Sequence, residues 1–372
     1  MSVIIGGDLV PYGNNTELFS IGAVEKILGR ELIQKWNKSD YRFFNLECPI
    51  TDSSDKIRKC GPNIKCSTKA ISGIKSLNPT CIMLSNNHIL DYGEQGLTDT
   101  LEILKRNNIR YVGVGKNYNS LIKTYEFLCD GKKVAIYNCC EHEFSVATNT
   151  TCGANPYEEN VTVDNIKSIS GKNDYVIIIY HGGKEHYRYP SPKLQKRCRD
   201  MIKAGANLVI CQHSHCVGCE EKYKNGTIVY GQGNFVFNLQ RNEYWNSSLL
   251  IEVDVAKNKI NYIPIVQTDY GSRMANEKES KKIIDGFMNR SQEIKNADFV
   301  EMRYKKYAAK ELSKYIVKVN GRKSIKIIHK FMPWLFKRVK FDYTAILNTI
   351  ECESHNELFT CGLRNKIRKD KE

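Results

Sequence analysis

The sequence contains none of the short motifs that mark the commonest nucleotide-dependent and serine-dependent enzymes. No Walker A sequence occurs, and the segments Gly113-Val114-Gly115 and Gly231-Gln232-Gly233 both lack the third glycine of a dinucleotide-binding loop. No Gly-x-Ser-x-Gly elbow is present either. These absences leave nucleotide-loop and serine-hydrolase functions without support.

Long apolar runs are also missing. No stretch of about 18 apolar residues occurs, so the sequence predicts no transmembrane helix. Residues 1–8 enter a strand at once, with no basic segment or long apolar segment before it, so no secretory signal is expected. We therefore predict a cytoplasmic protein, with or without peripheral contact at the inner membrane face. In that compartment its 14 cysteines are expected to be reduced thiols.

The cysteines and histidines do not form a familiar zinc motif. Cys216 and Cys219 have the Cys-x-x-Cys spacing, but a closed zinc site would need a second pair of ligands nearby in sequence. Residues 181–186 read His-x-x-x-Glu-His, which is not the zinc-protease spacing, and Gly182-Gly183 would weaken the helix that such motifs need. We interpret these cysteines as buried thiols and reject the protease hypothesis.

Charge is unevenly balanced. The chain has 56 Lys and Arg against 41 Asp and Glu, a net charge of +15. Such an excess favours anionic partners, here an anionic substrate (a phosphoester or an acidic polymer) or an acidic membrane surface. The alternative is a solvated basic face with no partner. No DNA- or RNA-binding motif accompanies the charge, so we predict no nucleic-acid partner.

The order of elements predicts an α/β protein with mixed sheets and helices outside them. Strands and helices alternate from residue 2 to about 269, and from 227 the pattern is purely β. One helix is well delimited, with Ser191 as N-cap, Pro192 at the first position and Gly205 as the stop. A second helix is expected over about 95–107.

Composition changes near residue 271. We predict one domain over 1–270 and a basic, mainly helical region over 271–372 that packs on or beside it, with helices at 299–318 and 325–339. Residues 331–336 are largely apolar and precede Lys337-Arg338, a pattern that suits a membrane surface or packing on the domain itself. Pro333 interrupts any continuous amphipathic helix there.

Polar segments follow the predicted strands and contain the candidate functional residues. They are Gly7-Asp8, Asn45-Leu46-Glu47, Asn86-Asn87-His88, His181-Gly182-Gly183, His213-Ser214-His215 and Gly233-Asn234-Phe235. The first five come after the apolar runs 3–5, 41–44, 81–84, 175–180 and 208–211. Because ligands bind at the carboxyl ends of strands in α/β folds, we expect these side chains to meet at one edge. Carboxylates, an amide and imidazoles together predict bound metal.

Any single residue of this set is weak evidence for a cation site. A lone buried histidine is usually a hydrogen-bonded core residue, and a lone Asp after a strand is usually a turn residue. His213-Ser214-His215 is a stronger signal, because residues two apart in an extended segment point the same way. The combined pattern is what predicts a cation site.

The same motifs resemble those of the capsule-synthesis (CapA-like, poly-γ-glutamate synthesis) family of the calcineurin-like metallophosphoesterase superfamily. The resemblance runs in order over about residues 2–237 and includes 45–51, 86–93, 181–185, 205–210, 213–215 and 230–235. It implies a four-layer αββα sandwich with a dinuclear metal site at one end. It also implies a role in capsule or exopolysaccharide biosynthesis, with capsule-assembly proteins as partners.

The resemblance assigns a role to each residue. Asp8 would bind the first metal together with His215, and Glu47 would bridge the two metals. The ligands of the second metal would be Asn87, His181 and His213. The catalytic group would comprise His88, which stabilises the transition state or protonates the leaving oxygen, and Asp91 and Glu185, which orient imidazoles.

Two departures from the superfamily pattern affect the metal count. Asp8-Leu9-Val10 lacks the histidine of Asp-x-His, and Glu47 replaces an aspartate. We therefore expect two divalent ions (Mn, Fe or Zn), or one held tightly. Two ions would share a water and lower its pKa from about 15.7 towards about 7, giving a hydroxide for hydrolysis of a phosphoester or of another bond in an anionic polymer. The alternatives are a metal-binding accessory protein of a capsule-assembly complex with little turnover, and a membrane-surface scaffold.

Overall fold

The computed structural model describes residues 1–59, 61–237, 242–320, 328, 330–336 and 350. It divides into two compact units, residues 1–302 and residues 303–372. The first unit contains every strand and every residue of the predicted metal site. The fold of that unit therefore determines whether the site forms.

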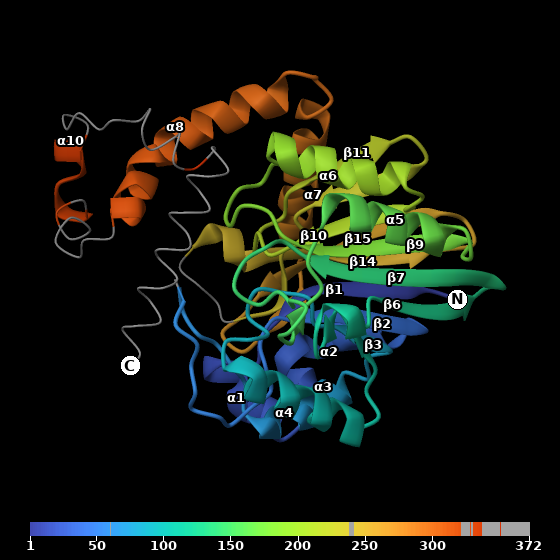
Figure 1. Ribbon diagram of the computed structural model, residues 1–372. Helices are drawn as coiled ribbons and strands as arrows, with labels where there is room; N and C mark the ends of the chain where they lie inside the picture. Colours follow the sequence, from blue (N-terminus) through green and yellow to red (C-terminus); the bar gives the residue numbers. More distant parts are fainter. Residues whose placement is uncertain (60, 238–241, 321–327, 329, 337–349, 351–372) are drawn as a thin grey trace. The chain divides into compact units, whose positions relative to one another are not determined.

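An eight-stranded sheet contains the first half of the site (Figure 1). Its strand order is β16-β15-β14-β1-β2-β3-β4, and β13 pairs with β1. The strands are β1 (Val3–Leu9), β2 (Tyr41–Leu46), β3 (Cys81–Met83), β4 (Tyr111–Val112), β13 (Asn234–Val236), β14 (Ser247–Asp254), β15 (Lys259–Gln267) and β16 (Ser272–Met274). Strands β1 to β4 and β13 run parallel, whereas β14 to β16 are antiparallel.

A six-stranded sheet contains the second half of the site. Its order is β11-β12-β10-β9-β7-β6. The strands are β6 (Thr124–Cys129), β7 (Lys132–Cys140), β9 (Tyr175–His181), β10 (Leu208–Gln212), β11 (Cys219–Tyr223) and β12 (Gly226–Tyr230). Strands β7, β9, β10 and β12 are parallel. A separate pair is formed by β5 (Val114–Gly115) and β8 (Gly153–Ala154).

The two sheets pack face to face because side chains alternate along each strand. Val3 and Ile5 of β1 lie in one buried cluster with Ile177 and Ile179 of β9, so this cluster is the interior of the sandwich. Ile4, between Val3 and Ile5, belongs to a different cluster on the outer face of its sheet. Strands with both faces buried read as continuous apolar runs, which is how they appear in the sequence.

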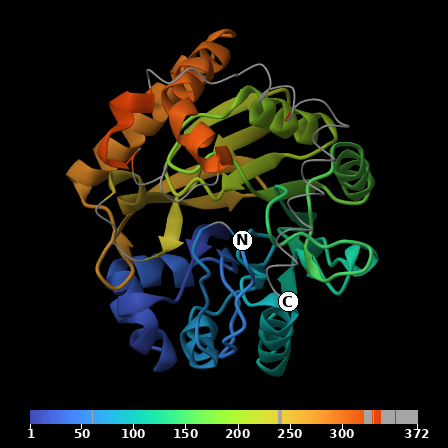
Figure 2. The same ribbon diagram turned by 60° about the vertical axis from the view of Figure 1, so that its left-hand side comes forward.

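Helices cover both outer faces, which makes four layers (Figures 1 and 2). The eight-stranded sheet is covered by α1 (Thr16–Ser20), α2 (Val24–Asn37), α3 (Ile71–Ser76) and α4 (Gly93–Arg106), and the six-stranded sheet by α5 (Glu159–Ser170) and α6 (Pro192–Lys203). Trp36 of α2 packs in the cluster of Ile4, and Met201 of α6 packs with Ile178 of β9. The predicted αββα architecture is confirmed.

Local predictions agree where capping or apolar runs were strong. The Ser191 Oγ accepts a hydrogen bond from the Leu194 N–H at 3.1 Å, and α6 ends just before Ala204. Strands β4 and β5 are separated by Gly113, which has a left-handed φ of 96°. The described residues include four short 3₁₀ helices, η1 (Gly13–Asn15), η2 (Thr68–Ala70), η3 (Tyr118–Ser120) and η4 (Glu243–Asn246).

The division of the chain falls after Met302, later than the position 270 that composition suggested. The reason is α7 (Glu277–Glu293), which packs against β11 and β15. Its Phe287 is buried in the cluster between the sheets, with its ring centroid 4.8 Å from that of Tyr262. Residues 271–302 therefore belong to the first unit.

The remaining described helices are α8 (Phe299–Asn320), close to the helix expected over 299–318, and α10 (Pro333–Phe336). Most of the helix expected over 325–339, and Lys337-Arg338, lie outside the described residues. Among the residues that the structure describes, no helix combines the length and the apolar character needed to span a bilayer.

Candidate metal centre

The six predicted ligands come from five strand ends that converge at one edge of the sandwich. Asp8 lies in β1 and pairs in register with Asn45 of β2 and Asn234 of β13. Glu47 follows β2 directly, and Asn87 lies four residues beyond the end of β3. From the facing sheet, His181 is the last residue of β9, and the other two histidines follow β10.

One group of donor atoms surrounds the Nε2 of His181. That nitrogen lies 3.0 Å from the Oδ1 of Asn87 and 3.2 Å from the Nδ1 of His213. It is also 3.3 Å from the Oε1 of Glu47. Four donor atoms from four segments of the chain therefore face one another, as in a cation site.

A second group shares Glu47 and is more open. The Oδ2 of Asp8 lies 3.7 Å from the Nδ1 of His215, and the Oε1 of Glu47 lies 3.9 Å from the Nε2 of the same ring. In each of the two groups, Glu47-His181-His213 and Asp8-Glu47-His215, the ligand atoms lie within 4.8 Å of one another. The arrangement places Glu47 between two candidate cation positions.

The residues present fit divalent cations. Glu47 is 0% exposed, and neither of its carboxylate oxygens has a hydrogen-bond partner. A buried carboxylate that accepts no hydrogen bond carries a desolvation cost of several kcal/mol, so such groups are normally neutralised by a nearby cation, here protonated His181 in the metal-free protein or a bound metal. Mixed oxygen and imidazole donors suit Mn²⁺, Fe or Zn²⁺.

Neighbouring amides hold the carboxylate of Asp8 in place. The Nδ2 of Asn45 donates to the Oδ1 of Asp8 at 2.7 Å, and the Nδ2 of Asn86 donates to the Oδ1 of Asn45 at 3.1 Å. The backbone N–H of His213 donates to the Oδ2 of Asp8 at 3.1 Å. Asn45 was not predicted as a site residue, although it lies within one of the quoted motifs.

The backbone at the two histidines after β10 differs from the expectation. An extended segment was predicted, but His213 and His215 both have left-handed φ values, 80° and 53°. Their ring centroids lie 6.0 Å apart, so the two rings still reach the same site. Left-handed backbone at non-glycine residues costs about 1–3 kcal/mol each and is concentrated at functional sites. The two histidines therefore reach the same site, but not through the extended backbone that we predicted.

Electrostatics around His181 reflect its carboxylate neighbours. Burial lowers the pKa of His181, but the adjacent carboxylates of Asp8 and Glu47 outweigh burial and raise the pKa to about 10. Burial raises the pKa of Asp8, and the imidazoles and Asn45 more than offset this, so that its pKa is lowered. Burial, with the charge of His181 second, lowers the pKa of His213 well below its usual value.

His88 and Asp91 lie together beside the ligands. The Nδ1 of His88 is 2.6 Å from the Oδ2 of Asp91, which also accepts the N–H of Ile64 at 2.7 Å. Lys59 forms an ion pair with Asp91, and its Nζ lies 3.0 Å from the Nδ1 of His88. The Lys59 and Asp91 side chains are 1% and 0% exposed. Lys59 was missed, because nothing in its loop sequence marks it as buried.

Glu185 does not reach the site imidazoles. It is exposed on the loop after β9, and no hydrogen bond or ion pair joins it to a site histidine among the described residues. Glu141, which follows β7, lies beside a site imidazole, with its Oε1 3.4 Å from the Nε2 of His213. Its Oε2 accepts the N–H of Gly183 at 3.2 Å. Glu141 therefore makes the contact with a site imidazole that we expected of Glu185.

An aromatic side chain stacks on the imidazole of the Asp8 group. The ring of Trp245, in η4, stacks on that of His215 with centroids 4.1 Å apart and planes 15° apart. Its indole N–H donates to the Nε2 of His186 at 2.6 Å. Trp245 was also not predicted, because it is 30 residues from His215 and belongs to no periodic pattern.

No second metal cluster competes with this one in the described parts of the chain. The two groups that share Glu47 are the candidate cation sites found there. Eleven cysteines are described and all are free thiols, with Cys216 and Cys219 both buried. This agrees with our interpretation of the Cys-x-x-Cys pair.

The four-layer sandwich, with carboxylates and imidazoles gathered at the strand ends of both sheets, defines a protein with the metallophosphoesterase fold. Residues 2–239 match the family described as bacterial capsule synthesis protein PGA_cap. The chain belongs to this family, and the resemblance found in the sequence is confirmed.

Two curated relatives carry related names. The chain is 30% identical to the capsule biosynthesis protein CapA of Bacillus anthracis over 208 residues, which cover 54% of this chain and 51% of that protein. It is 27% identical to the PGA biosynthesis protein CapA of Bacillus subtilis strain 168 over 227 residues, 59% of each chain. The match thus spans only about half of each relative's length. Among solved structures, a phosphatase from Mycoplasma pneumoniae aligns with 72% of this chain and 94% of its own at 15% identity, with a TM-score of 0.46.

Proposed function

We propose that this protein is a metal-dependent hydrolase that cleaves a phosphoester bond during capsule or poly-γ-glutamate synthesis. The observation that carries the proposal is the carboxylate of Glu47, buried without a hydrogen-bond partner between two sets of ligand atoms. Such a carboxylate is costly unless cations neutralise it. Asp8, Asn87 and the three histidines supply the remaining donor atoms around it.

The residues have separate tasks in this proposal. Two divalent ions held there would lower the pKa of a shared water and offset charge on the scissile group. Because the Nδ1 of His88 is bonded to Asp91, its Nε2 is the nitrogen that donates a proton to the leaving oxygen. Lys59 fixes the other oxygen of Asp91 and so fixes the orientation of His88.

A second candidate is a metal-binding accessory protein with little turnover. The observation that favours it is the composition of the Asp8 group, which contains three ligands, one of them shared. Val10 occupies the place of the histidine in Asp-x-His and is buried among apolar side chains. One firmly bound ion and one weak ion would bind an anionic polymer but hydrolyse it slowly.

Metal analysis combined with turnover separates the two candidates. Protein purified without chelator should contain one to two transition-metal ions per chain. With added Mn²⁺ it should hydrolyse an aryl phosphodiester or monoester, and His88→Ala should abolish that activity while the metal content is retained. His142→Ala is the matched control, because His142 belongs to neither group of candidate ligands and its Nε2 lies within hydrogen-bond distance of the carbonyl of Tyr157. Inactivity on a panel of esters and acidic polymers, with normal metal content, would favour the accessory role.

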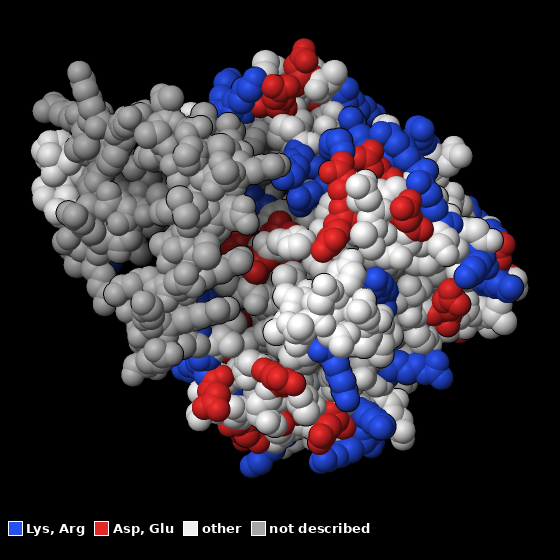
Figure 3. Space-filling view, in the orientation of Figure 1, with Lys and Arg blue, Asp and Glu red and all other residues white. Residues whose placement is uncertain are grey.

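Where the protein acts is also a proposal. We place it in the cytoplasm with capsule-assembly proteins as partners, and with peripheral contact at the membrane through Phe331 and Trp334, which are 72% and 54% exposed. On the face shown in Figure 3, basic and acidic side chains are interspersed over the described residues. Liposome flotation of the full chain and of a chain ending at Met302 tests the membrane contact. Equal flotation of the two would exclude it.

A further inference from the structure

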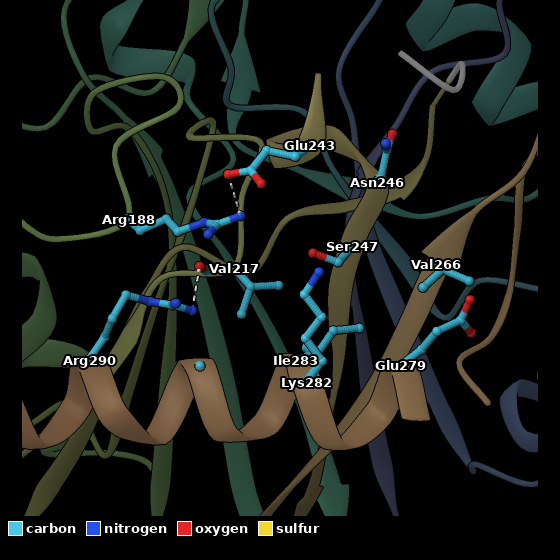
Figure 4. Close-up of a pocket in the computed structure, with 11 residues that line it drawn as sticks. Arg188, Val217, Glu243, Asn246, Ser247, Val266, Glu279, Lys282, Ile283 and Arg290 are labelled. Atoms are coloured by element: carbon cyan, nitrogen blue, oxygen red, sulfur yellow. Dashed lines mark hydrogen bonds and ion pairs between the residues drawn. The ribbon is translucent and has the colours of Figure 1, made fainter. Parts of the chain in front are cut away.

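A cavity of about 290 Å³ lies between α7 and the strands β14 and β15, next to η4 (Figure 4). Ser247 at the start of β14 and Val266 of β15 line one side, and Lys282 and Arg290 of α7 line another. Arg188 enters from the loop after β9. Small-molecule sites usually measure about 300–1,000 Å³, so this cavity suits one small group rather than a nucleotide.

Positive charge dominates the lining. Three cations, Arg188, Lys282 and Arg290, face two carboxylates. Glu279 is already occupied, because both of its oxygens accept hydrogen bonds from Arg273 at 2.8 Å. Glu243 lies 3.6 Å from Arg188, and its side chain is 71% exposed. An excess of positive charge therefore remains inside the cavity.

Some of these cations keep unused hydrogen-bond donors. The Nε of Arg188 is buried and has no hydrogen-bond partner among the described residues. Lys282 makes no hydrogen bond or ion pair within the described part of the chain, and Figure 4 shows its side chain extending from α7 towards the same space as Arg188. A buried charged donor without an acceptor is destabilising, and a bound anion would supply the acceptor that the Nε of Arg188 lacks.

Arg290 is held differently. Its guanidinium donates to the carbonyl of Gly218 at 2.8 Å and to that of Val217 at 3.0 Å, which fixes it against the cavity wall. Burial, with repulsion from Arg188 second, lowers the pKa of Arg290. The two guanidinium groups are thus close enough to repel each other, and an anion between them would relieve that repulsion.

The cavity shares a structural element with the metal centre. Glu243 and Asn246 of η4 line the cavity, and Trp245 of the same turn stacks on His215 of the metal centre. Both sites are therefore bordered by the same 3₁₀ turn.

We propose that this cavity is a second subsite, in which Arg188 and Lys282 bind a carboxylate of an acidic peptide chain whose neighbouring part lies at the metal centre. The substrate class rests on the proposed function, whereas the binding does not require turnover. Apolar side chains of Val217 and Ile283 in the lining suit the methylene groups of a glutamate side chain. A phosphate dianion has no such groups to place against these side chains.

Calorimetric titration of the chelator-treated full-length protein with a pentaglutamate peptide, α-linked or γ-linked, tests the subsite. We expect Arg188→Gln to weaken binding about tenfold, as the loss of a charged hydrogen bond in a partly buried site. Lys282→Gln should weaken it about threefold, because this lysine is exposed. The control Lys278→Gln removes the same charge from an exposed position of α7 outside the cavity and should have no effect.

The outcomes separate this proposal from the hydrolase proposal. Equal affinities in Lys282→Gln, Lys278→Gln and the unmodified protein would overturn the subsite, even if Arg188→Gln unfolds. Inorganic phosphate that binds more tightly than the peptide would also overturn it. Retained selectivity for the peptide in a protein with no esterase activity would leave the subsite standing and reject hydrolysis alone.

Discussion

The two halves of the candidate metal centre, the His181 group and the Asp8 group, differ in how closely their donor atoms approach. Around His181, three donor atoms lie within 3.3 Å of one nitrogen, and each comes from a different segment. Around His215, the Oδ2 of Asp8 lies 3.7 Å from the Nδ1 and the Oε1 of Glu47 lies 3.9 Å from the Nε2, and the ring of Trp245 stacks on the imidazole. Preorganised ligands lose less freedom when they bind. We therefore expect the His181 group to hold its ion more tightly than the Asp8 group.

Replacing the shared carboxylate should affect both halves and so give the largest loss of metal. In Glu47→Gln the anionic oxygen between the two groups is replaced by a neutral amide, and Mn²⁺ affinity should fall at least about 100-fold at both positions. Titration of chelator-treated protein followed by elemental analysis measures this. The control Glu143→Gln changes an exposed carboxylate on a nearby loop. Normal metal content in Glu47→Gln would contradict the hypothesis that Glu47 binds metal in both groups.

Replacing one histidine from each half tests the asymmetry directly. His181→Asn should remove the tightly held ion, whereas His215→Asn should leave about one ion per chain, because the His181 group remains intact. Asparagine is chosen because it accepts left-handed backbone such as that of residue 215. Elemental analysis of both variants after the same dialysis gives the result. Equal losses would show that the halves do not differ.

Proton release should identify the His181 half without any mutation. With its pKa raised to about 10 by Asp8 and Glu47, His181 carries a proton in the metal-free protein at pH 8 and must lose it to bind metal. We expect about one proton released with the first ion, and an affinity that rises as the pH increases towards 10. Calorimetry in buffers of different ionisation enthalpy counts the protons. Release of no proton would contradict the expectation that His181 is protonated beside Asp8 and Glu47 in the metal-free protein.

Lys59→Met should have the smallest effect on metal content, because Lys59 touches neither half. It leaves Asp91 buried without its cation, and we expect a loss of about 3–5 kcal/mol in the free energy of unfolding. Urea unfolding measures that loss. The double variant Lys59→Met/Asp91→Asn should recover stability but not turnover, since His88 then lacks its carboxylate. Full turnover in the double variant would contradict the positioning role.

The sequence predicted which residues meet at the candidate metal centre better than it predicted their surroundings, and the reason is physical. Asp8 and His181 lie at the ends of strands buried on both faces, and such strands read as continuous apolar runs in the sequence. Parallel strands end at a common edge, so the residues after the runs were expected to meet. The layers followed from the same runs, with the capped helix at Ser191 as the clearest local signal.

The residues that were missed come from segments without periodicity. Lys59 and Trp245 lie in irregular or 3₁₀ segments, and their contacts with His88 and His215 exist only after the sandwich has formed. Glu141 and Glu185 both follow a strand, and the sequence cannot tell which of the two faces the imidazoles. The boundary at 270 failed for a similar reason, because Phe287 is one apolar side chain in a polar helix and yet enters the core.

The pairing of Asp8 with the backbone of His213, 205 residues further along the chain, has a consequence for how the protein matures. During synthesis at about 5–20 residues per second, roughly 10–40 s pass between the emergence of these two ligands. Strand β1 must also wait for β13 and β14, its later neighbours in the sheet. A nascent chain therefore lacks the complete set of donor atoms, and we expect metal to bind only after synthesis is complete.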